Sequence, residues 1–253
     1  MSDLSVTFEK GVCQIAITRA AKRNTISAEN CAEIVRILLQ AQRDSQVHCL
    51  VLRGDGAIFC AGADLGEILH RTEQTQAAYD ALIEALIAFD KPLLAAVNGP
   101  AVGLGVALLQ YCDLVYCGEK SLFSLPFTAL GLAPEYGLSY LASSRAGLRK
   151  ISEKLLLSEP ISAQEALSMG LVSAVFKDED VVRETLSRAA RLTQLPLGSL
   201  RATKKLLRQN QAASLRAAIS LEKEVLAERL QSDEAQEACR AFSEGRKPNF
   251  SAR

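Results

Sequence analysis

The most informative segment of the chain reads Gly54-Asp-Gly-Ala-Ile-Phe-Cys-Ala-Gly-Ala-Asp-Leu65. It follows Cys49-Leu-Val-Leu52, which has the composition of a buried strand, and it ends in an acid that could begin a helix. Glycine and very small side chains let a ligand approach the backbone closely, so the useful groups here would be main-chain N–H donors. Taken alone, the segment fits a tight strand-to-helix connection better than a site.

A second glycine-lined turn reads Ala96-Val-Asn-Gly-Pro-Ala-Val-Gly-Leu-Gly-Val-Ala-Leu-Leu109. It also follows a short apolar strand and leads into a helix. The free N–H groups and the positive dipole end of such a helix suit a developing negative charge. Neither G-x-G-x-x-G nor a Walker lysine occurs, so the turn is a poor match to a dinucleotide or ATP loop.

Outward from these turns, apolar strands alternate with helices over about the first 175 residues, which predicts an α/β core with parallel strand pairing. Beyond Val175 the pattern changes to helix after helix, with no strand between them, over residues 179–194, 197–209, 214–231 and 233–243. We therefore expect a core over residues 1–195 that holds the active site, followed by a C-terminal helical region over residues 196–253.

Composition excludes several classes of function. In 253 residues, 29 basic side chains balance 29 acidic ones, so no global charge favours nucleic acid or a membrane surface. The seven cysteines form no C-x-x-C pair, and the two histidines have no partner at metal-ligand spacing. Neither a signal peptide nor an apolar run of roughly 18 residues is present. These features predict a cytoplasmic protein with reduced thiols and no metal site.

Two motifs, Phe59-Cys-Ala-Gly-Ala-Asp-Leu65 and Ala96-Val-Asn-Gly99 with Gly103 and Gly105, resemble the paired signatures of the enoyl-CoA hydratase/isomerase (crotonase) superfamily. The resemblance implies an α/β crotonase (ClpP-like) spiral of ββα turns with a C-terminal helical trimerisation region. It also implies homotrimers, often paired into hexamers. The expected substrate is an acyl-CoA thioester, so coenzyme A enters as part of the substrate and no cofactor is permanently bound.

The same resemblance assigns roles to individual residues. The N–H groups of Ala63 and Leu104 would form an oxyanion hole. Ala61 and the Asp64 backbone would lie along the adenine, and Lys22 and Arg23, in a turn that resembles the family's early CoA-contacting segment, would lie near the CoA phosphates or base. Two preorganised N–H donors stabilise the enolate of a thioester, and loss of one typically costs ~10²–10³ in rate.

Family hydratases use two glutamates, and this chain has neither. At the matching positions stand Ala107 and Phe127. Water addition to a 2-enoyl-CoA would therefore lack its usual acid–base pair, which argues against a simple hydratase.

One carboxylate follows in Leu125-Pro-Phe-Thr-Ala-Leu-Gly-Leu-Ala-Pro-Glu135, a run that resembles the peroxisomal-type Δ3,Δ2-enoyl-CoA isomerases. In that subgroup a single glutamate shuttles a proton, which makes Glu135 the predicted catalytic base. The alternative is that Glu135 is a solvated first-turn helix residue, favoured there by the helix dipole. The neighbouring Phe123, Phe127, Leu125 and Leu138 would either wall an apolar pocket that raises its pKa or belong to the core.

Three further interpretations stay open. Glu135 could serve a divergent hydratase or another acyl-CoA lyase, or the chain could be a non-catalytic crotonase-fold protein that binds acyl-CoA or a protein.

A basic helix face, formed by Arg201, Lys204, Lys205 and Arg208, could be solvated, border the CoA phosphates, or bind nucleic acid. With zero net charge, no nucleic-acid partner is expected. Glu67, after the first motif, could face the substrate, but an exposed helix position is expected for it.

Overall fold

A six-stranded sheet forms the centre of the molecule in the computed structural model, which describes residues 3–69 and 71–250. Its strands lie in the order β1 (Leu4–Glu9), β2 (Val12–Ile17), β3 (Cys49–Gly54), β4 (Leu93–Val97), β6 (Leu114–Gly118) and β9 (Ala174–Phe176). β1 pairs antiparallel with β2, and the other neighbours pair parallel. The predicted α/β core with parallel pairing is confirmed.

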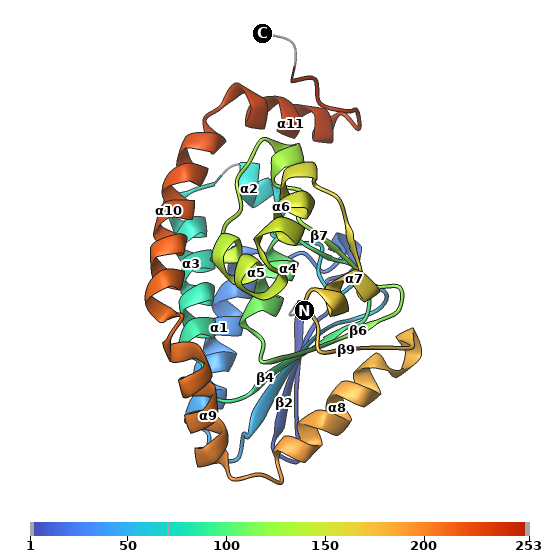
Figure 1. Ribbon diagram of the computed structural model, residues 1–253, viewed down its shortest axis with the longest axis vertical. Helices are drawn as coiled ribbons and strands as arrows, with labels where there is room; N and C mark the ends of the chain where they lie inside the picture. The colour runs from blue at the N-terminus through green and yellow to red at the C-terminus, as the bar shows by residue number, and fades with distance from the viewer. Residues whose placement is uncertain (1–2, 70, 251–253) are drawn as a thin grey trace.

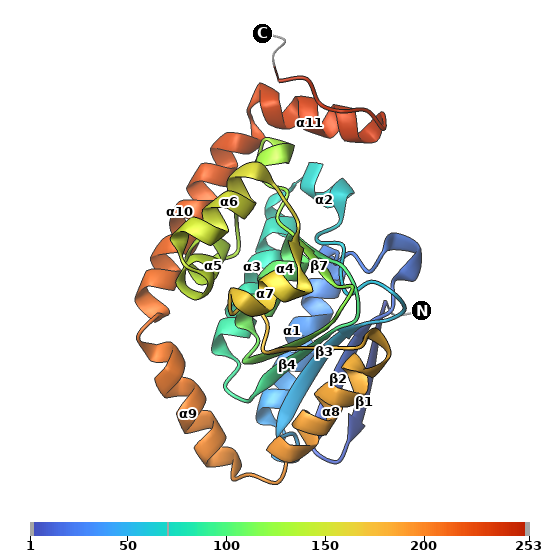
Figure 2. The ribbon, with the colours of Figure 1, turned by 45° about the vertical axis from the view of Figure 1, so that its right-hand side comes forward.

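Helices cover both faces of this sheet, which explains why β3 and β4 are almost continuously apolar. α1 (Ala28–Arg43) and α3 (Glu73–Ala88) pack against each other on one face, and α8 (Val181–Leu192) lies against β3 and β4 on the other (Figures 1 and 2). The Ser27 side chain caps the start of α1 by accepting a hydrogen bond from the Asn30 N–H.

A short second layer accompanies the large sheet. Strands β5 (Ala101–Val102), β7 (Leu122–Ser124) and β8 (Ile161–Ser162) form a three-stranded sheet. Two single parallel bridges, Ile26 to Ala63 and Cys60 to Ala101, extend the same layer to the earlier turns of the chain. Successive turns thus stack as strand, short strand and helix, which is the arrangement expected of a spiral of ββα turns.

Shorter helices connect these layers. They are α2 (Leu65–Leu69), α4 (Leu104–Tyr111), α5 (Leu138–Ala146), α6 (Leu148–Leu157) and α7 (Ala163–Ser168), with 3-10 turns at Ala20–Lys22, Thr128–Leu130 and Asp178–Asp180. The sequence pattern predicted α4, the helix after the second glycine-lined turn, but had not indicated α5 or α6.

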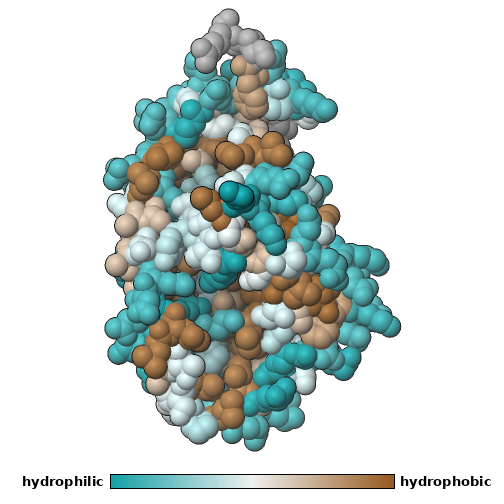
Figure 3. Space-filling model, in the orientation of Figure 1, coloured by the Kyte–Doolittle hydropathy of each residue, from teal (hydrophilic) through white to brown (hydrophobic). Residues whose placement is uncertain are grey.

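The C-terminal region consists of α9 (Leu197–Gln209), α10 (Ala212–Leu230) and α11 (Asp233–Ser243), close to the predicted helices. The chain between α8 and α9 contains the predicted boundary at residues 195 and 196. α9 and α10 run along one side of the molecule and α11 lies across one end (Figure 1). Apolar surface gathers over α9 and the start of α10, at the lower left of Figure 3, and the side chains of Leu206 and Leu207 are 70% and 74% exposed.

Within the described ranges, no helix has both the length and the apolar character needed to cross a bilayer.

Candidate active site

The two glycine-lined turns meet through their backbones. The Val102 N–H donates to the Cys60 carbonyl at 2.9 Å. A Cβ atom on Gly105 would lie 2.6 Å from that carbonyl oxygen, and one on Gly62 would lie 3.0 Å from the Val102 oxygen. These contacts are too close for any side chain, so the small residues are required for the two turns to lie side by side.

The bridge between Ile26 and Ala63 leaves the Ala63 N–H free. Ile26 uses both of its backbone groups, donating to the Gly62 carbonyl at 2.8 Å and accepting from the Asp64 N–H at 2.9 Å. Ala63, between those two partners, contributes neither of its own groups. Its N–H donates no hydrogen bond within residues 3–69 and 71–250.

The Leu104 N–H is free for a different reason. Leu104 is the first residue of α4, after Gly103 with φ +49°, so its N–H has no acceptor inside the helix. It too donates no hydrogen bond in the described part of the chain. A Cβ atom on Gly62 would lie 3.9 Å from the Leu104 nitrogen, which brings the residue next to Ala63 close to this second donor. The structure thus brings the two predicted oxyanion-hole residues together.

Arg23 and Asn24 form the turn before α1, with φ values of +53° and +56°. The Asn24 amide donates to the Asp55 and Ile58 carbonyls at 2.9 and 2.7 Å, and the Arg23 carbonyl accepts from the Ala61 N–H at 3.1 Å. Ala61 is therefore tied directly to this turn. The Lys22 and Arg23 side chains are exposed and, among the described residues, form no ion pair.

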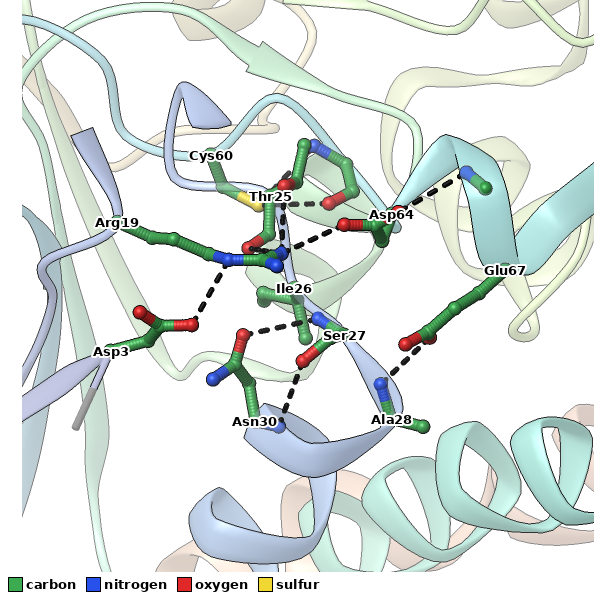
Figure 4. A network of polar contacts seen from close by, with 12 residues as sticks. Asp3, Arg19, Thr25, Ile26, Ser27, Ala28, Asn30, Cys60, Asp64 and Glu67 are labelled. Atoms are coloured by element: carbon green, nitrogen blue, oxygen red, sulfur yellow. Dashed lines mark hydrogen bonds and ion pairs between the residues drawn. The ribbon is translucent and has the colours of Figure 1, made fainter. Parts of the chain in front are cut away.

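Asp64 is held at the same junction (Figure 4). Its carboxylate pairs with Arg19 at 2.9 Å and accepts from the Gly66 N–H at 3.1 Å, while Arg19 also reaches Asp3 at 3.0 Å. The Asp64 N–H donates to Ile26, and its carbonyl accepts from the start of α2. Both backbone groups of Asp64 are therefore already hydrogen-bonded, so a nucleotide would contact the Asp64 backbone by van der Waals packing rather than by a hydrogen bond.

Glu67 does not occupy the exposed helix position expected from the sequence. Its carboxylate accepts from the Ala28 N–H and from the Tyr79 hydroxyl, both at 2.8 Å. Ala28 is the first residue of α1, so the negative charge faces the positive end of that helix. Spacing along α2 could not indicate this, because Ala28 and Tyr79 lie far from Glu67 in the sequence.

Glu135 lies in the loop before α5 and is only 8% exposed. The Arg71 guanidinium donates to its carboxylate at 2.9 Å. Burial raises the pKa of Glu135 above its usual value, and the neighbouring Arg71 and Tyr136 partly oppose that rise. Glu135 is therefore not the solvated first-turn residue of the alternative interpretation, because α5 begins at Leu138 and its N-terminus faces a different carboxylate, that of Glu222.

Contacts through aromatic residues connect the Glu135 loop to the N–H donors. The Tyr136 and Tyr79 rings lie 6.2 Å apart, centroid to centroid. The Tyr79 hydroxyl, which shares its one proton between the Glu67 carboxylate and the Ile26 carbonyl, lies 2.9 Å from that carbonyl oxygen, which also accepts from the Asp64 N–H beside Ala63. Neither Tyr79 nor Arg71 was identified from the sequence.

The positions of the missing hydratase glutamates are filled by core residues. Ala107 is fully buried and Phe127 is 6% exposed. Phe123, Leu125 and Leu138 are buried in the main core cluster as well. These apolar residues thus belong to the core rather than to an open pocket wall.

The basic face of α9 docks on the core. Arg201 pairs with Asp90, and Asp113 pairs with Lys204 at 2.8 Å and with Arg208 at 2.7 Å. Burial lowers the pKa of Lys204 to about 8. These ion pairs hold the basic face of α9 against the core.

The thiol of Cys60, in the first glycine-lined turn, is unreactive. Burial raises the pKa of the Cys60 thiol to about 12, so it is not a nucleophile at neutral pH. Among the described residues, no three His, Cys, Asp or Glu side chains are grouped as metal ligands.

Fold and sequence together place the chain in a known family. A profile of the enoyl-CoA hydratase/isomerase family matches residues 7–253, and the chain belongs to that family. It superposes on an enoyl-CoA hydratase/isomerase from Pseudoalteromonas atlantica T6c with a TM-score of 0.93 at 32% identity, covering 99% of this chain and 100% of that one. Pseudomonas aeruginosa OdaA gives 0.91 at 32% identity, covering 96% and 99%. The crotonase fold is thereby confirmed.

Sequence relatives within the family carry out different reactions. Human enoyl-CoA delta isomerase 2 is 34% identical over 93% of this chain, which spans only 61% of that protein. The 2,3-dehydroadipyl-CoA hydratase of Escherichia coli K12 is 32% identical over the full length of both chains. A 4-chlorobenzoyl coenzyme A dehalogenase of Arthrobacter is 33% identical over 76% of this chain and 73% of that protein. The chain is thus an enzyme of the family, and an acyl-CoA thioester fits as its substrate.

Proposed function

We propose that this protein is a Δ3,Δ2-enoyl-CoA isomerase with Glu135 as its single acid–base group. The observation that carries the proposal is the combination of a buried carboxylate, Glu135, in the loop before α5 with apolar residues at both positions where a hydratase of the family has glutamate. An isomerase adds no water, so one carboxylate suffices.

The reaction would proceed in two proton transfers. The Glu135 carboxylate takes a proton from C2 of a 3-enoyl-CoA, and the electron pair moves onto the thioester oxygen. The N–H groups of Ala63 and Leu104, which have no acceptor in the described structure, hold the resulting dienolate. Glu135 then returns the proton at C4, and the double bond lies between C2 and C3.

The surroundings of Glu135 suit this role. Burial makes the carboxylate a stronger base than one in water, while the Arg71 guanidinium keeps it ionised before the substrate arrives. Because the pKa of Glu135 is raised in the folded protein, it lies above the ordinary range of a glutamate. We expect activity to be lost as the pH falls through this raised pKa, because Glu135 then becomes protonated.

Coenzyme A would enter along the turn before α1. Lys22 and Arg23 present exposed cations to its phosphates, and Ala61 and Asp64 line the approach to the Ala63 N–H. No separate cofactor is required by this chemistry.

The exposed leucines of α9 support a second part of the proposal, that the C-terminal region assembles the chain into trimers or hexamers. Light scattering coupled to gel filtration measures the mass directly. A monomer at micromolar concentration would contradict the assembly.

Two substrates distinguish an isomerase from a divergent hydratase. With 3-hexenoyl-CoA, the proposal predicts a product of unchanged mass with the absorbance of a conjugated enoyl thioester. With 2-hexenoyl-CoA, it predicts no product one water heavier. Rapid hydration of 2-hexenoyl-CoA without isomerisation would replace the proposal with a hydratase, and binding without either reaction would indicate a non-catalytic acyl-CoA protein.

A further inference from the structure

The turn that carries Glu135 is held from the C-terminal region. The carboxylate of Glu222, on α10, accepts the Gly137 N–H through one oxygen at 2.6 Å and the Ser139 N–H through the other at 2.8 Å. We propose that Glu222 is a positioning residue for the isomerase reaction: it fixes the turn at residues 135–137 and so holds the Glu135 carboxylate in place. This inference rests on the proposed function, and it makes α10 part of the active site.

The turn has a conformation that needs support. Tyr136 and Gly137 both lie in the left-handed region, with φ values of +66° and +74°. For a tyrosine this conformation is strained and persists only where its surroundings enforce it. Two contacts enforce it: the Glu222 carboxylate on the N–H side, and the Tyr111 hydroxyl, which donates to the Tyr136 carbonyl at 2.5 Å.

α10 packs directly on this turn. A Cβ atom on Gly137 would lie 2.5 Å from Leu215 of α10 and 2.9 Å from the Tyr111 hydroxyl. α10 runs beside α5 in both ribbon views (Figures 1 and 2). The turn is therefore clamped between α4, which carries Tyr111, and α10, so a shift of α10 would move the residues next to Glu135.

The Glu222 carboxylate is placed for this task rather than for an ion pair. It is 6% exposed and pairs with no cation among the described residues. Burying a carboxylate is costly, and here two N–H donors and the positive end of α5 are what compensate it. Burial raises the pKa of Glu222, and the hydrogen bonds from those N–H groups partly oppose that rise.

Glu222 also acts on Glu135 through its charge. Burial raises the pKa of Glu135, and the negative charge of Glu222 raises it further. Arg71 and Tyr136 act in the opposite direction and lower that pKa. Three other charged residues line this site, and they are Asp80, Glu84 and Lys223. Asp80 pairs with Lys223 at 2.9 Å, and Glu84 pairs with Arg216 at 3.0 Å. Removing the charge of Glu222 therefore lowers the pKa of Glu135.

The test is Glu222→Gln, with Glu224→Gln as the matched control on the exposed side of the same helix. Glutamine keeps the shape but has one acceptor oxygen, so one of the two N–H groups loses its partner. We expect kcat to fall ~10-fold with little change in KM, since a displacement of about 1 Å costs up to ~10²-fold. The acid limb of the pH profile should move to lower pH, and the control should match the wild type.

A second measurement separates this inference from the proposed function. Hydrogen exchange of the Gly137 and Ser139 amides reports on the Glu222 contacts without any turnover, and both should exchange faster in Glu222→Gln. If the wild type fails to isomerise 3-hexenoyl-CoA, the proposed function is wrong even where exchange accelerates. If the wild type is active but Glu222→Gln keeps its kcat, its pH profile and slow exchange, the positioning role is overturned.

Tyr111→Phe provides an independent variant should Glu222→Gln fail to fold. It removes the hydroxyl that holds the Tyr136 carbonyl and keeps the ring. The same fall in kcat, without the shift in the acid limb, supports positioning of the turn. Unchanged kcat in a folded Tyr111→Phe protein would count against it.

Discussion

Gly105→Ala tests whether close backbone packing builds the pair of N–H donors. Gly105 lies one residue after Leu104 in α4, and its Cβ atom would lie 2.6 Å from the Cys60 carbonyl oxygen and 3.0 Å from the Cys60 Cβ atom. Carbon–oxygen contacts in proteins normally exceed about 3.3 Å. The two turns must therefore separate by about 0.7 Å, which strains the 2.9 Å hydrogen bond from the Val102 N–H.

The magnitude follows from two opposing terms. Overpacking of this kind costs ~1–3 kcal/mol, and alanine in place of glycine within a helix returns ~0.5–1 kcal/mol. The net loss of ~1–2 kcal/mol lowers the melting temperature by roughly 2–8 °C in a chain of this length. Because the displacement acts between the two N–H donors, kcat for 3-hexenoyl-CoA should fall by up to ~10²-fold.

Gly198→Ala is the control. Gly198 also lies one residue after the start of a helix, α9, but apart from its chain neighbours and the backbone of its own helix, no described atom lies within 4 Å of the position that a methyl group would take there. Calorimetry should show it as stable as the wild type or slightly more so, with unchanged kcat. If Gly105→Ala has the same melting temperature and the same kcat as Gly198→Ala, the two turns do not pack as described, and close backbone packing does not build the pair of N–H donors.

Three other changes probe the surroundings of the site. Arg71→Met removes the cation that lowers the pKa of Glu135, so the acid limb of kcat/KM should move to higher pH; an unmoved limb would show that the pair does not form in solution. Glu67→Gln weakens the contacts to the Ala28 N–H and the Tyr79 hydroxyl and should cost ~1–3 kcal/mol in urea unfolding, against no loss if Glu67 is solvated. Iodoacetamide at pH 8 should label Cys239 first, because the six other cysteines are buried, and mass spectrometry of early labelling at Cys60 would contradict that.

Local sequence predicted the parts of the structure that depend on neighbouring residues. The glycine spacing in the two turns indicated backbone chemistry, since a side chain at Gly62 or Gly105 would prevent the turns from meeting. A serine followed three residues later by a glutamate is a local signature of a helix start, and Ser162 and Glu165 form this capping box, with the Ser162 N–H donating to the Glu165 carboxylate at 2.8 Å. Parallel pairing of the strands followed from the alternation of apolar strands and helices.

Contacts between distant residues could not be predicted. Arg71 reaches Glu135 across 64 positions, and Glu222 reaches Gly137 across 85. Neither partner carries a local pattern, because an arginine before a helix and a glutamate within a long helix both fit an exposed face. Glu67 was misplaced for the same reason.

The role of Glu135 as the catalytic base is tested by the rate at which the wild type and Glu135→Gln convert 3-hexenoyl-CoA into the conjugated 2-enoyl thioester. Glu119→Gln, a change at an exposed glutamate, serves as the control. We expect turnover by the wild type and by the control, and a ~10²–10⁴-fold loss in Glu135→Gln with the fold intact. Equal rates for Glu135→Gln and the wild type would show that another group carries the proton.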